Sequence, residues 1–238
     1  MSTSTPTVHS SASATATPEF WERFWRTGGI QFAGLFIVAY FVYGSQPHVG
    51  ATTEALVAFY QGDRMRIVIA AVLGGLAILN LMWFAAAIRT TLADAGQDGW
   101  GAAATASSAA LGGLSILLVA VVATLALSVA GSGNPTLLGA FNDFVWSGVV
   151  MSSFPRAMLI MSAAFGLWRA RFISNGLFAV GVAAVVLELL GGTTWASDGV
   201  WAPDGIYSRV AAPLIGVVWI LTVSRVLLAR GPATRPSW

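Results

Sequence analysis

The sequence contains no cysteine and no lysine, and each absence excludes a class of chemistry. Without cysteine the chain cannot form disulfides, thiolate zinc sites or iron–sulfur clusters, and it has no thiol nucleophile. Without lysine it cannot form a Schiff base to retinal or pyridoxal, nor the phosphate clamp of a P-loop. The two histidines, His9 and His48, lie in a polar tail and in a loop, so a haem or multi-histidine metal site is not expected. We therefore expect neither a metal nor a cofactor.

Charge is scarce as well. Only 9% of the 238 residues are charged and 56% are hydrophobic, whereas about 25% charged residues are usual in soluble domains. A chain with so few charges cannot cover a water-facing surface, so a lipid bilayer has to be the solvent for most of it. The net charge of +2 is too small to indicate nucleic-acid binding. The composition predicts an all-α, polytopic membrane protein.

Six segments are apolar enough to be membrane-spanning helices, each of which needs about 20 residues. In chain order they are Ile30–Gly44, Ile67–Ile88, Ser107–Ala130, Phe144–Trp168, Phe172–Leu190 and Val210–Ala229. The first is short, and we extend it back to Phe24 as an uncleaved span, with Trp21 and Trp25 as interfacial anchors. We predict a six-helix transmembrane domain over residues 21–230. A disordered Ser/Thr/Ala-rich tail (1–20) precedes it, and a short tail (231–238) follows it.

Arginines near the ends of the spans predict the orientation. Eight of them lie on the side that holds both termini, namely Arg23, Arg26, Arg89, Arg169, Arg171, Arg225, Arg230 and Arg235. The opposite side holds three, Arg64, Arg66 and Arg209. Cytoplasmic loops carry the excess of basic residues. We therefore predict a multi-pass protein of the bacterial cytoplasmic (inner) membrane with both termini in the cytoplasm.

Two longer loops lie on the predicted outer side. In the first, Thr52 or Thr53 is suited to cap a short helix. The apolar face of that helix consists of Leu56, Phe59 and Tyr60. We expect it to be an interfacial helix lying on the membrane surface.

In the second loop, Trp195 and Trp201 are either interface anchors or part of a binding surface.

Arg156 is a charged residue in the middle of the fourth predicted span, where charge is costly. Helical periodicity places Asn142, Ser152 and Ala163 on the same face as Arg156, so we expect this face to point at protein or at a wet cavity. Pro155 removes a backbone N–H inside the helix. The span should therefore bend beside Arg156, with neighbouring serines satisfying the freed backbone groups.

Glu188 is the second ionisable residue inside a predicted span. It shares a helix face with the small residues Gly181 and Ala184, so we expect it to point inward. Helical rise places it roughly 10–15 Å nearer the outer surface than Arg156. Both a direct ion pair and a water-bridged pair with Arg156 stay open. Either residue could also serve only to hold helices in register.

Further charges gather at the same outer end, which suggests a polar vestibule floored by Arg156 and walled by Glu188. The candidate ligand-binding residues are Arg156, Glu188, Asp143, Asn142, Ser152, Arg64, Arg66, Arg209, Trp195 and Trp201. An arginine surrounded by acids suits the binding of an anion or a zwitterion. No HExxH, GxSxG or DxD spacing supports a catalytic site.

The stretch TTEALVAFYQGDRMRIVIAAVLGGLAILNLMWFAAAIRTTLADAG combines a short helix that ends in a "Y…R" step with a span that closes on "WF…AIR…L". This pattern resembles a group of uncharacterised six-span bacterial integral membrane proteins, of the domain-of-unknown-function kind. The resemblance implies a fold and a membrane location, but no activity and no functional residues.

Three functions are consistent with these patterns. The first is a membrane protein without enzymatic activity that binds a small amphiphile or lipid, or another membrane protein, in the outer vestibule. The second is a small-solute transporter or channel, which the proline break in the fourth span favours. The third is an intramembrane enzyme that uses outer-face carboxylates. Membrane lipids are the expected partners, nucleic acid is not, and the oligomeric state stays open.

Overall fold

The computed structural model describes residues 26–229, and these residues form helices and no strand. The predicted N- and C-terminal tails and the anchors Trp21 and Trp25 lie outside the described residues. The all-α prediction is confirmed for the part of the chain that the structure describes.

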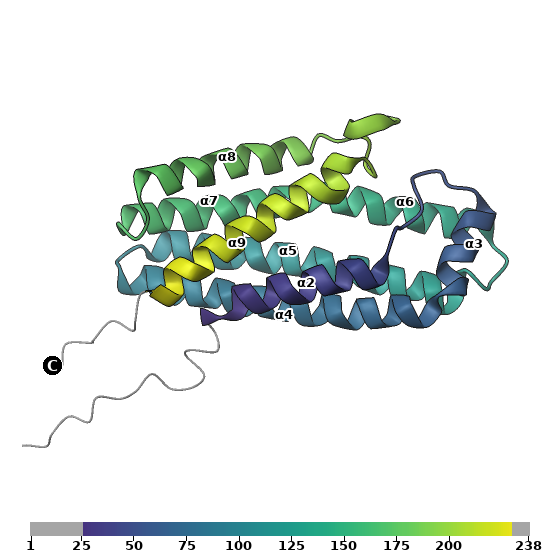
Figure 1. Ribbon diagram of the computed structural model, residues 1–238, viewed down its shortest axis with the longest axis horizontal. Helices are drawn as coiled ribbons and strands as arrows, with labels where there is room; N and C mark the ends of the chain where they lie inside the picture. The colour runs from purple at the N-terminus through teal and green to yellow at the C-terminus, as the bar shows by residue number, and fades with distance from the viewer. Residues whose placement is uncertain (1–25, 230–238) are drawn as a thin grey trace, which may run out of the picture.

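The helices run up and down along one long axis (Figure 1). In chain order they are α2 (Gly28–Tyr43), α3 (Thr53–Gly62), α4 (Arg64–Asp94), α5 (Asp98–Thr124), the π-helix η1 (Leu125–Val129), α6 (Pro135–Met151), α7 (Ser153–Arg169), α8 (Asn175–Gly191), the 3₁₀ turn η2 (Gly199–Trp201), the π-helix η3 (Tyr207–Ala211) and α9 (Ala212–Ala229). The short α3 lies across one end of the bundle, and α9 crosses it obliquely (Figure 1). We call the end that carries α3 the α3 end.

Four helical stretches are long and apolar enough to cross a membrane, which indicates a membrane protein. They are Arg64–Asp94, Asp98–Val129, Pro135–Arg169 and Tyr207–Ala229. The other two apolar helices, α2 with 16 residues and α8 with 17, are shorter. They extend about 25 Å each at 1.5 Å per residue, less than the roughly 30 Å of a hydrocarbon core. Six spans therefore stay a prediction.

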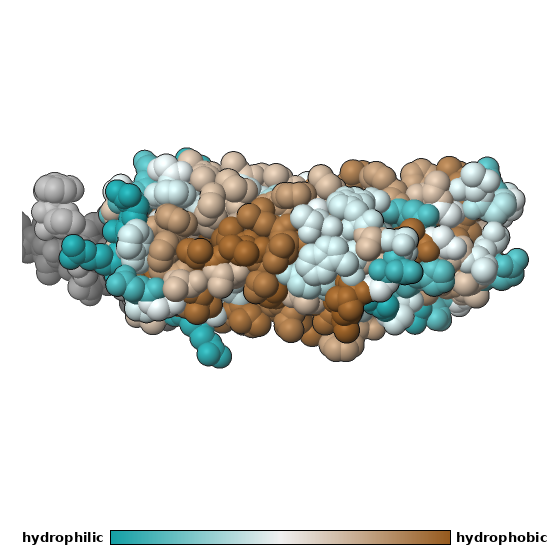
Figure 2. Space-filling view, turned by 90° about the horizontal axis from the view of Figure 1, so that it is seen from above, coloured by the Kyte–Doolittle hydropathy of each residue, from teal (hydrophilic) through white to brown (hydrophobic). Residues whose placement is uncertain are grey.

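Large apolar side chains are exposed along the middle of the bundle. Phe41 is 76% exposed and Leu214 is 57% exposed. In the space-filling view, apolar residues form a band across the middle of the visible face, and hydrophilic residues lie near its ends (Figure 2). Contiguous apolar surface of this kind is unfavourable in water and favourable in lipid.

The buried core consists of two hydrophobic clusters. One, at the end opposite α3, holds Phe84, Ile88 and Leu167. The other lies beneath α3 and includes Leu56 and Tyr60, which are 2% and 0% exposed. The short helix was predicted with Thr52 or Thr53 as its cap, and Thr52 is the cap. The expectation that its apolar face lies on the membrane surface is wrong for these two side chains, which pack into the protein.

A pair of glycines lets α2 approach its neighbours closely at the end opposite α3. A Cβ atom on Gly28 would lie 3.1 Å from the Asn80 carbonyl oxygen in α4. A Cβ atom on Gly29 would overlap Ser224 Oγ and lie 3.0 Å from Ile220 Cγ2, both in α9. The two helices therefore meet at this end, and they diverge toward the α3 end (Figure 1).

We predict that Gly29→Val destabilises the protein by about 1–3 kcal/mol, because the added methyl groups overpack the contact with α9. Thermal unfolding in detergent, followed by the fluorescence of the 10 tryptophans, measures the effect. Gly34→Val is the matched control on α2, since no atom lies within 4 Å of a Cβ added at Gly34. Equal melting temperatures for the two variants would contradict this packing.

Candidate functional site

Arg156 and Glu188 form a direct ion pair inside the bundle. Arg156 Nε donates to Glu188 Oε2 at 2.7 Å, and the two side chains are 13% and 0% exposed. The depth difference expected from the sequence is wrong. Arg156 lies 13 residues before the last residue of α7, Arg169, and Glu188 lies 13 residues after the first residue of α8, Asn175. Equal helical rise from the connecting turn brings the two side chains level.

Small residues on α8 and α9 make room for the pair. The buried residues of α8 are Gly181, Ala184, Glu188 and Gly191, which confirms the predicted inward face. On α9, a Cβ atom at Gly216 would lie 2.8 Å from Arg156 Cδ and 3.3 Å from Glu188 Oε1. The ion pair is therefore packed between α7, α8 and α9.

The helix that carries Arg156 is interrupted beside it. α6 ends at Met151 and α7 begins at Ser153, so one residue, Ser152, interrupts the helix. Ser152 keeps helical dihedral angles and Pro135–Arg169 continues as one apolar stretch, so the predicted bend stays a prediction. Ser152 Oγ donates to the Val149 carbonyl at 2.6 Å. Arg156 Nη2 donates to Ser153 Oγ at 3.1 Å and more distantly, at 3.5 Å, to Ser152 Oγ. The break thus supplies hydroxyl acceptors to the charge, and Arg156 Nη1 has no partner among the described residues.

Asn142 belongs to a different cluster, so its expected place beside Arg156 is wrong. It lies 14 residues before Arg156, which is about 21 Å along a helix. Its Oδ1 accepts from Tyr60 at 3.0 Å and from Gln46 Nε2 at 3.2 Å, and its Nδ2 donates to the His48 carbonyl at 3.2 Å. Burial, together with the nearby Asp143 carboxylate, raises the pKa of Tyr60 to about 12. The Tyr60 hydroxyl therefore keeps its proton and donates.

The outer carboxylates do not surround Arg156, contrary to the expectation from the sequence. Asp143 Oδ1 accepts from the Gly50 N–H at 3.2 Å, and Asp204 Oδ2 accepts from the Val49 N–H at 3.2 Å. Trp146 Nε1 adds a hydrogen bond of 2.8 Å to the Pro47 carbonyl. These groups hold the segment 46–50 against α6 and against the loop before α9. We call this segment the α2–α3 strap.

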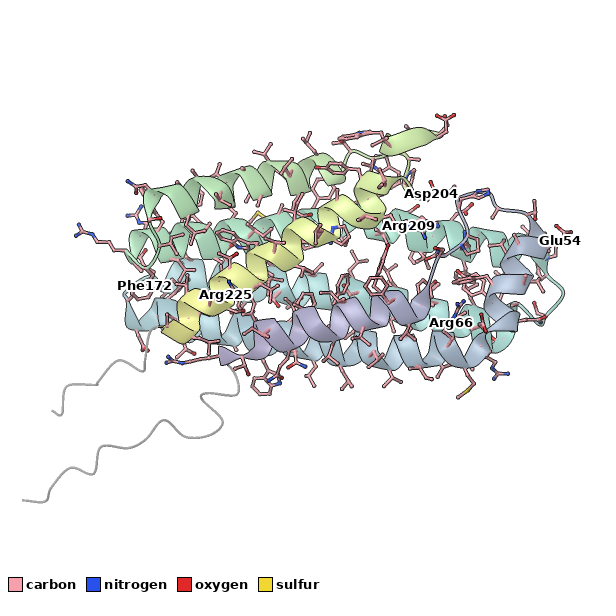
Figure 3. All side chains as sticks on the ribbon, in the orientation of Figure 1. Glu54, Arg66, Phe172, Asp204, Arg209 and Arg225 are labelled. Carbon is pink, nitrogen blue, oxygen red and sulfur yellow. The ribbon has the colours of Figure 1, made fainter. Side chains whose placement is uncertain are left out.

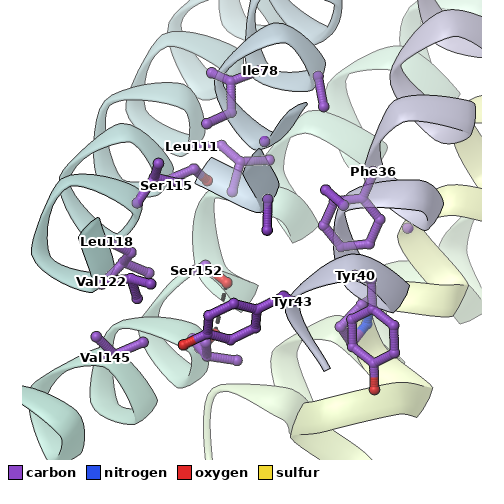
Figure 4. Close-up of a pocket in the computed structure, with 18 of the residues that line it drawn as sticks. Phe36, Tyr40, Tyr43, Ile78, Leu111, Ser115, Leu118, Val122, Val145 and Ser152 are labelled. Carbon is purple, nitrogen blue, oxygen red and sulfur yellow. Dashed lines mark hydrogen bonds between the residues drawn. The ribbon is translucent and has the colours of Figure 1, made fainter. Parts of the chain in front are cut away.

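A cavity of about 300 Å³ lies between α2, α4, α5, α6 and α9. Most of its lining is apolar, as in the close-up, where Phe36, Leu118 and Val145 are among the labelled side chains that line it (Figure 4). The polar groups of the lining include Arg156, Ser152 and Arg209. Glu188 is fully covered and is not part of the lining. The structure thus contains an internal hollow, but an apolar one rather than the expected polar vestibule.

The other predicted site residues separate into two groups. Arg209 lines the cavity. Arg66 pairs with Asp63 at 3.3 Å and lies over the Phe59 ring, 5.5 Å from its centroid. Neither Arg66 nor the remaining three residues line the cavity. Arg64 is exposed, Trp195 donates to the Gly192 carbonyl, and Trp201 packs on the Tyr207 ring. Arg66 and Arg209 lie toward the α3 end, whereas Arg225 lies toward the opposite end (Figure 3).

Sequence reasoning missed the wall that α2 contributes. Phe32, Phe36, Tyr40 and Tyr43 all line the cavity. Their spacing of four, four and three residues places them on one helix face. This aromatic periodicity was available in the sequence, although it does not distinguish a cavity wall from an ordinary core face.

We predict that Arg156→Met or Glu188→Leu alone destabilises the protein by about 3–5 kcal/mol, because each leaves the other charge buried without a partner. The double variant should recover most of the loss, since it removes both charges. Melting temperatures in detergent compare the three. Additive losses in the double variant would show that the pair is not coupled.

We predict that Asn142→Leu loosens the α2–α3 strap, because it removes the amide that joins Tyr60, Gln46 and the His48 carbonyl. Hydrogen–deuterium exchange at the Val49 and Gly50 amides should be at least about tenfold faster, since a lost buried hydrogen-bond partner costs about 1–3 kcal/mol. Asn80→Leu is the control, because among the described residues the Asn80 amide donates to the Leu76 carbonyl of its own helix and to no other element. Unchanged exchange in Asn142→Leu would refute the role of this cluster.

Comparisons with known proteins do not assign a function to this arrangement. No protein-family model, curated protein or solved structure matches the chain. The resemblance to six-span bacterial membrane proteins therefore stays a prediction, and the function has to be inferred from the contacts, burial and charge of the residues themselves.

Proposed function

We propose that this chain is a six-span protein of the bacterial inner membrane that binds a small amphiphile or lipid in its central cavity. The arrangement of α2 and α8 supports six spans, because each runs beside the long spans from one end of the bundle toward the other (Figure 1). The arginine distribution supports cytoplasmic termini, with the α3 end facing outward.

The observation that carries the proposal is an apolar cavity with guanidinium groups in its wall. Its volume of about 300 Å³ is at the lower end of ligand pockets, roughly 300–1,000 Å³. An apolar lining favours hydrocarbon over a polar solute. Arg156 and Arg209 supply the few polar groups that orient a ligand in such pockets.

The dimensions of the cavity favour a single chain. It follows α2 from Phe32 to Tyr43, about 16 Å at 1.5 Å per residue. This distance is close to the extended length of a dodecyl chain. A probe with one dodecyl chain is therefore the natural test of the proposal.

Small-solute transport is a second candidate, and the interruption of the α6–α7 helix at Ser152 favours it, because transporters place discontinuous helices at their binding sites. An intramembrane enzyme has less support. Asp143 and Asp204 accept backbone N–H groups of the strap, and the described residues contain no group of three His, Asp or Glu side chains that could hold a metal ion.

We predict that Ser115→Phe abolishes amphiphile binding by filling the cavity, which Ser115 lines (Figure 4). The probe is dodecanol with a photoreactive diazirine at the chain end. In wild type it should label peptides of α2 and α5 saturably. Ile116→Phe adds the same ring to the adjacent residue, which is 52% exposed, and should preserve the labelling.

The two variants give a direct comparison once both elute as monodisperse species in the same detergent. Equal labelling of Ser115→Phe and wild type would contradict the proposed cavity site. Flux of the probe between liposome compartments that stops with Ser115→Phe would favour transport instead of binding alone.

A further inference from the structure

Arg209 is a half-buried cation without a counter-ion among residues 26–229. It lies in η3, at the start of the last helix. Its guanidinium forms no ion pair or hydrogen bond with the described side chains. The nearby Asp204 carboxylate accepts from the Val49 N–H, and Glu188 pairs with Arg156. Desolvating a charge without a partner is unfavourable, so this position suits an anion.

Arg209 also lies where two hollows meet. It lines the central cavity and a second hollow of about 160 Å³ between α2 and α9. Both hollows share Phe36, Tyr40, Pro213 and Val217. These side chains and Arg209 lie between the two hollows, so along the gap between α2 and α9 they separate the central cavity from the outer hollow.

The outer hollow opens on an apolar surface. Ile37, Phe41 and Leu214 line it, and all three are exposed. In a membrane such residues face hydrocarbon. A molecule that enters the cavity through this gap enters laterally from the lipid and passes beside the Arg209 guanidinium.

The charges around the cavity select the head group. Glu188 pairs with Arg156, whereas no carboxylate of the described residues forms an ion pair with Arg209, so its guanidinium is available to an anion. A monoanion with one alkyl chain matches this charge and the single-chain dimensions of the cavity. A carboxylate matches the planar fork of a guanidinium with two parallel hydrogen bonds.

We propose that the gap between α2 and α9 admits a fatty acid from the membrane, with its carboxylate on Arg209 and its chain in the central cavity. This inference rests on the proposed amphiphile-binding function and adds the head group, the anchoring residue and the route of access.

The test measures equilibrium binding of radiolabelled dodecanoate, dodecanol and dodecyl phosphate to the full chain in phosphatidylcholine nanodiscs at pH 8. Dodecanoate should bind wild type at least about tenfold more tightly than dodecanol, as a charge-assisted pair implies. Arg209→Gln should lower the affinity for dodecanoate to that for dodecanol, and an unchanged melting temperature in detergent shows that the variant is folded. Arg225→Gln removes an exposed arginine of the same helix and should change neither affinity.

Each of the other outcomes would overturn one part of the proposal. Equal binding of dodecanoate and dodecanol to wild type would overturn the carboxylate assignment while the cavity function stands. A preference that survives Arg209→Gln would overturn Arg209 as the anchor. Tighter binding of dodecyl phosphate than of dodecanoate would replace the fatty acid by a phosphate amphiphile. Failure of all three probes to bind wild type would refute the proposed function itself.

Discussion

A guanidinium in the middle of an apolar span must find its acceptors inside the protein, because hydrocarbon offers none. Arg156 meets this constraint with one carboxylate from α8 and with hydroxyls from the helix break that precedes it. The ion pair requires α7 and α8 to keep their register, and it requires Gly216 on α9 to leave room. Three helices are therefore positioned by the need to satisfy one charge.

The cavity results from the way the other helices pack around the Arg156–Glu188 ion pair. Gly28 and Gly29 hold α2 against α4 and α9 at the end opposite α3, so α2 diverges from α9 toward the other end. At that end the α2–α3 strap is held by side chains of α6 instead of filling the interior. The result is an apolar hollow with Arg156 and Arg209 in its wall. Among residues 26–229, Arg156 pairs with a carboxylate and Arg209 does not, which is the asymmetry that a ligand can use.

Much of the fold was predictable because its signals are local. Apolar runs predicted the helices, and Thr52 or Thr53 predicted the start of α3. The small residues Gly181 and Ala184 predicted that Glu188 faces inward. The candidate site was predicted less well. Asn142 shares a helical face with Arg156 by periodicity, yet its partners come from the α2–α3 strap and from α3, and no local pattern indicates them.

Composition and periodicity by themselves determined that this chain is helical and apolar, which positions are costly for charge, and which chemistries its missing cysteine and lysine exclude. Only the tertiary structure decided that Arg156 pairs directly with Glu188, that the outer acids bind backbone amides, and that the hollow is apolar. The physical reason is that secondary structure depends on neighbours along the chain. Ion pairs and cavities depend instead on the relative depth and tilt of helices, which only their mutual packing determines.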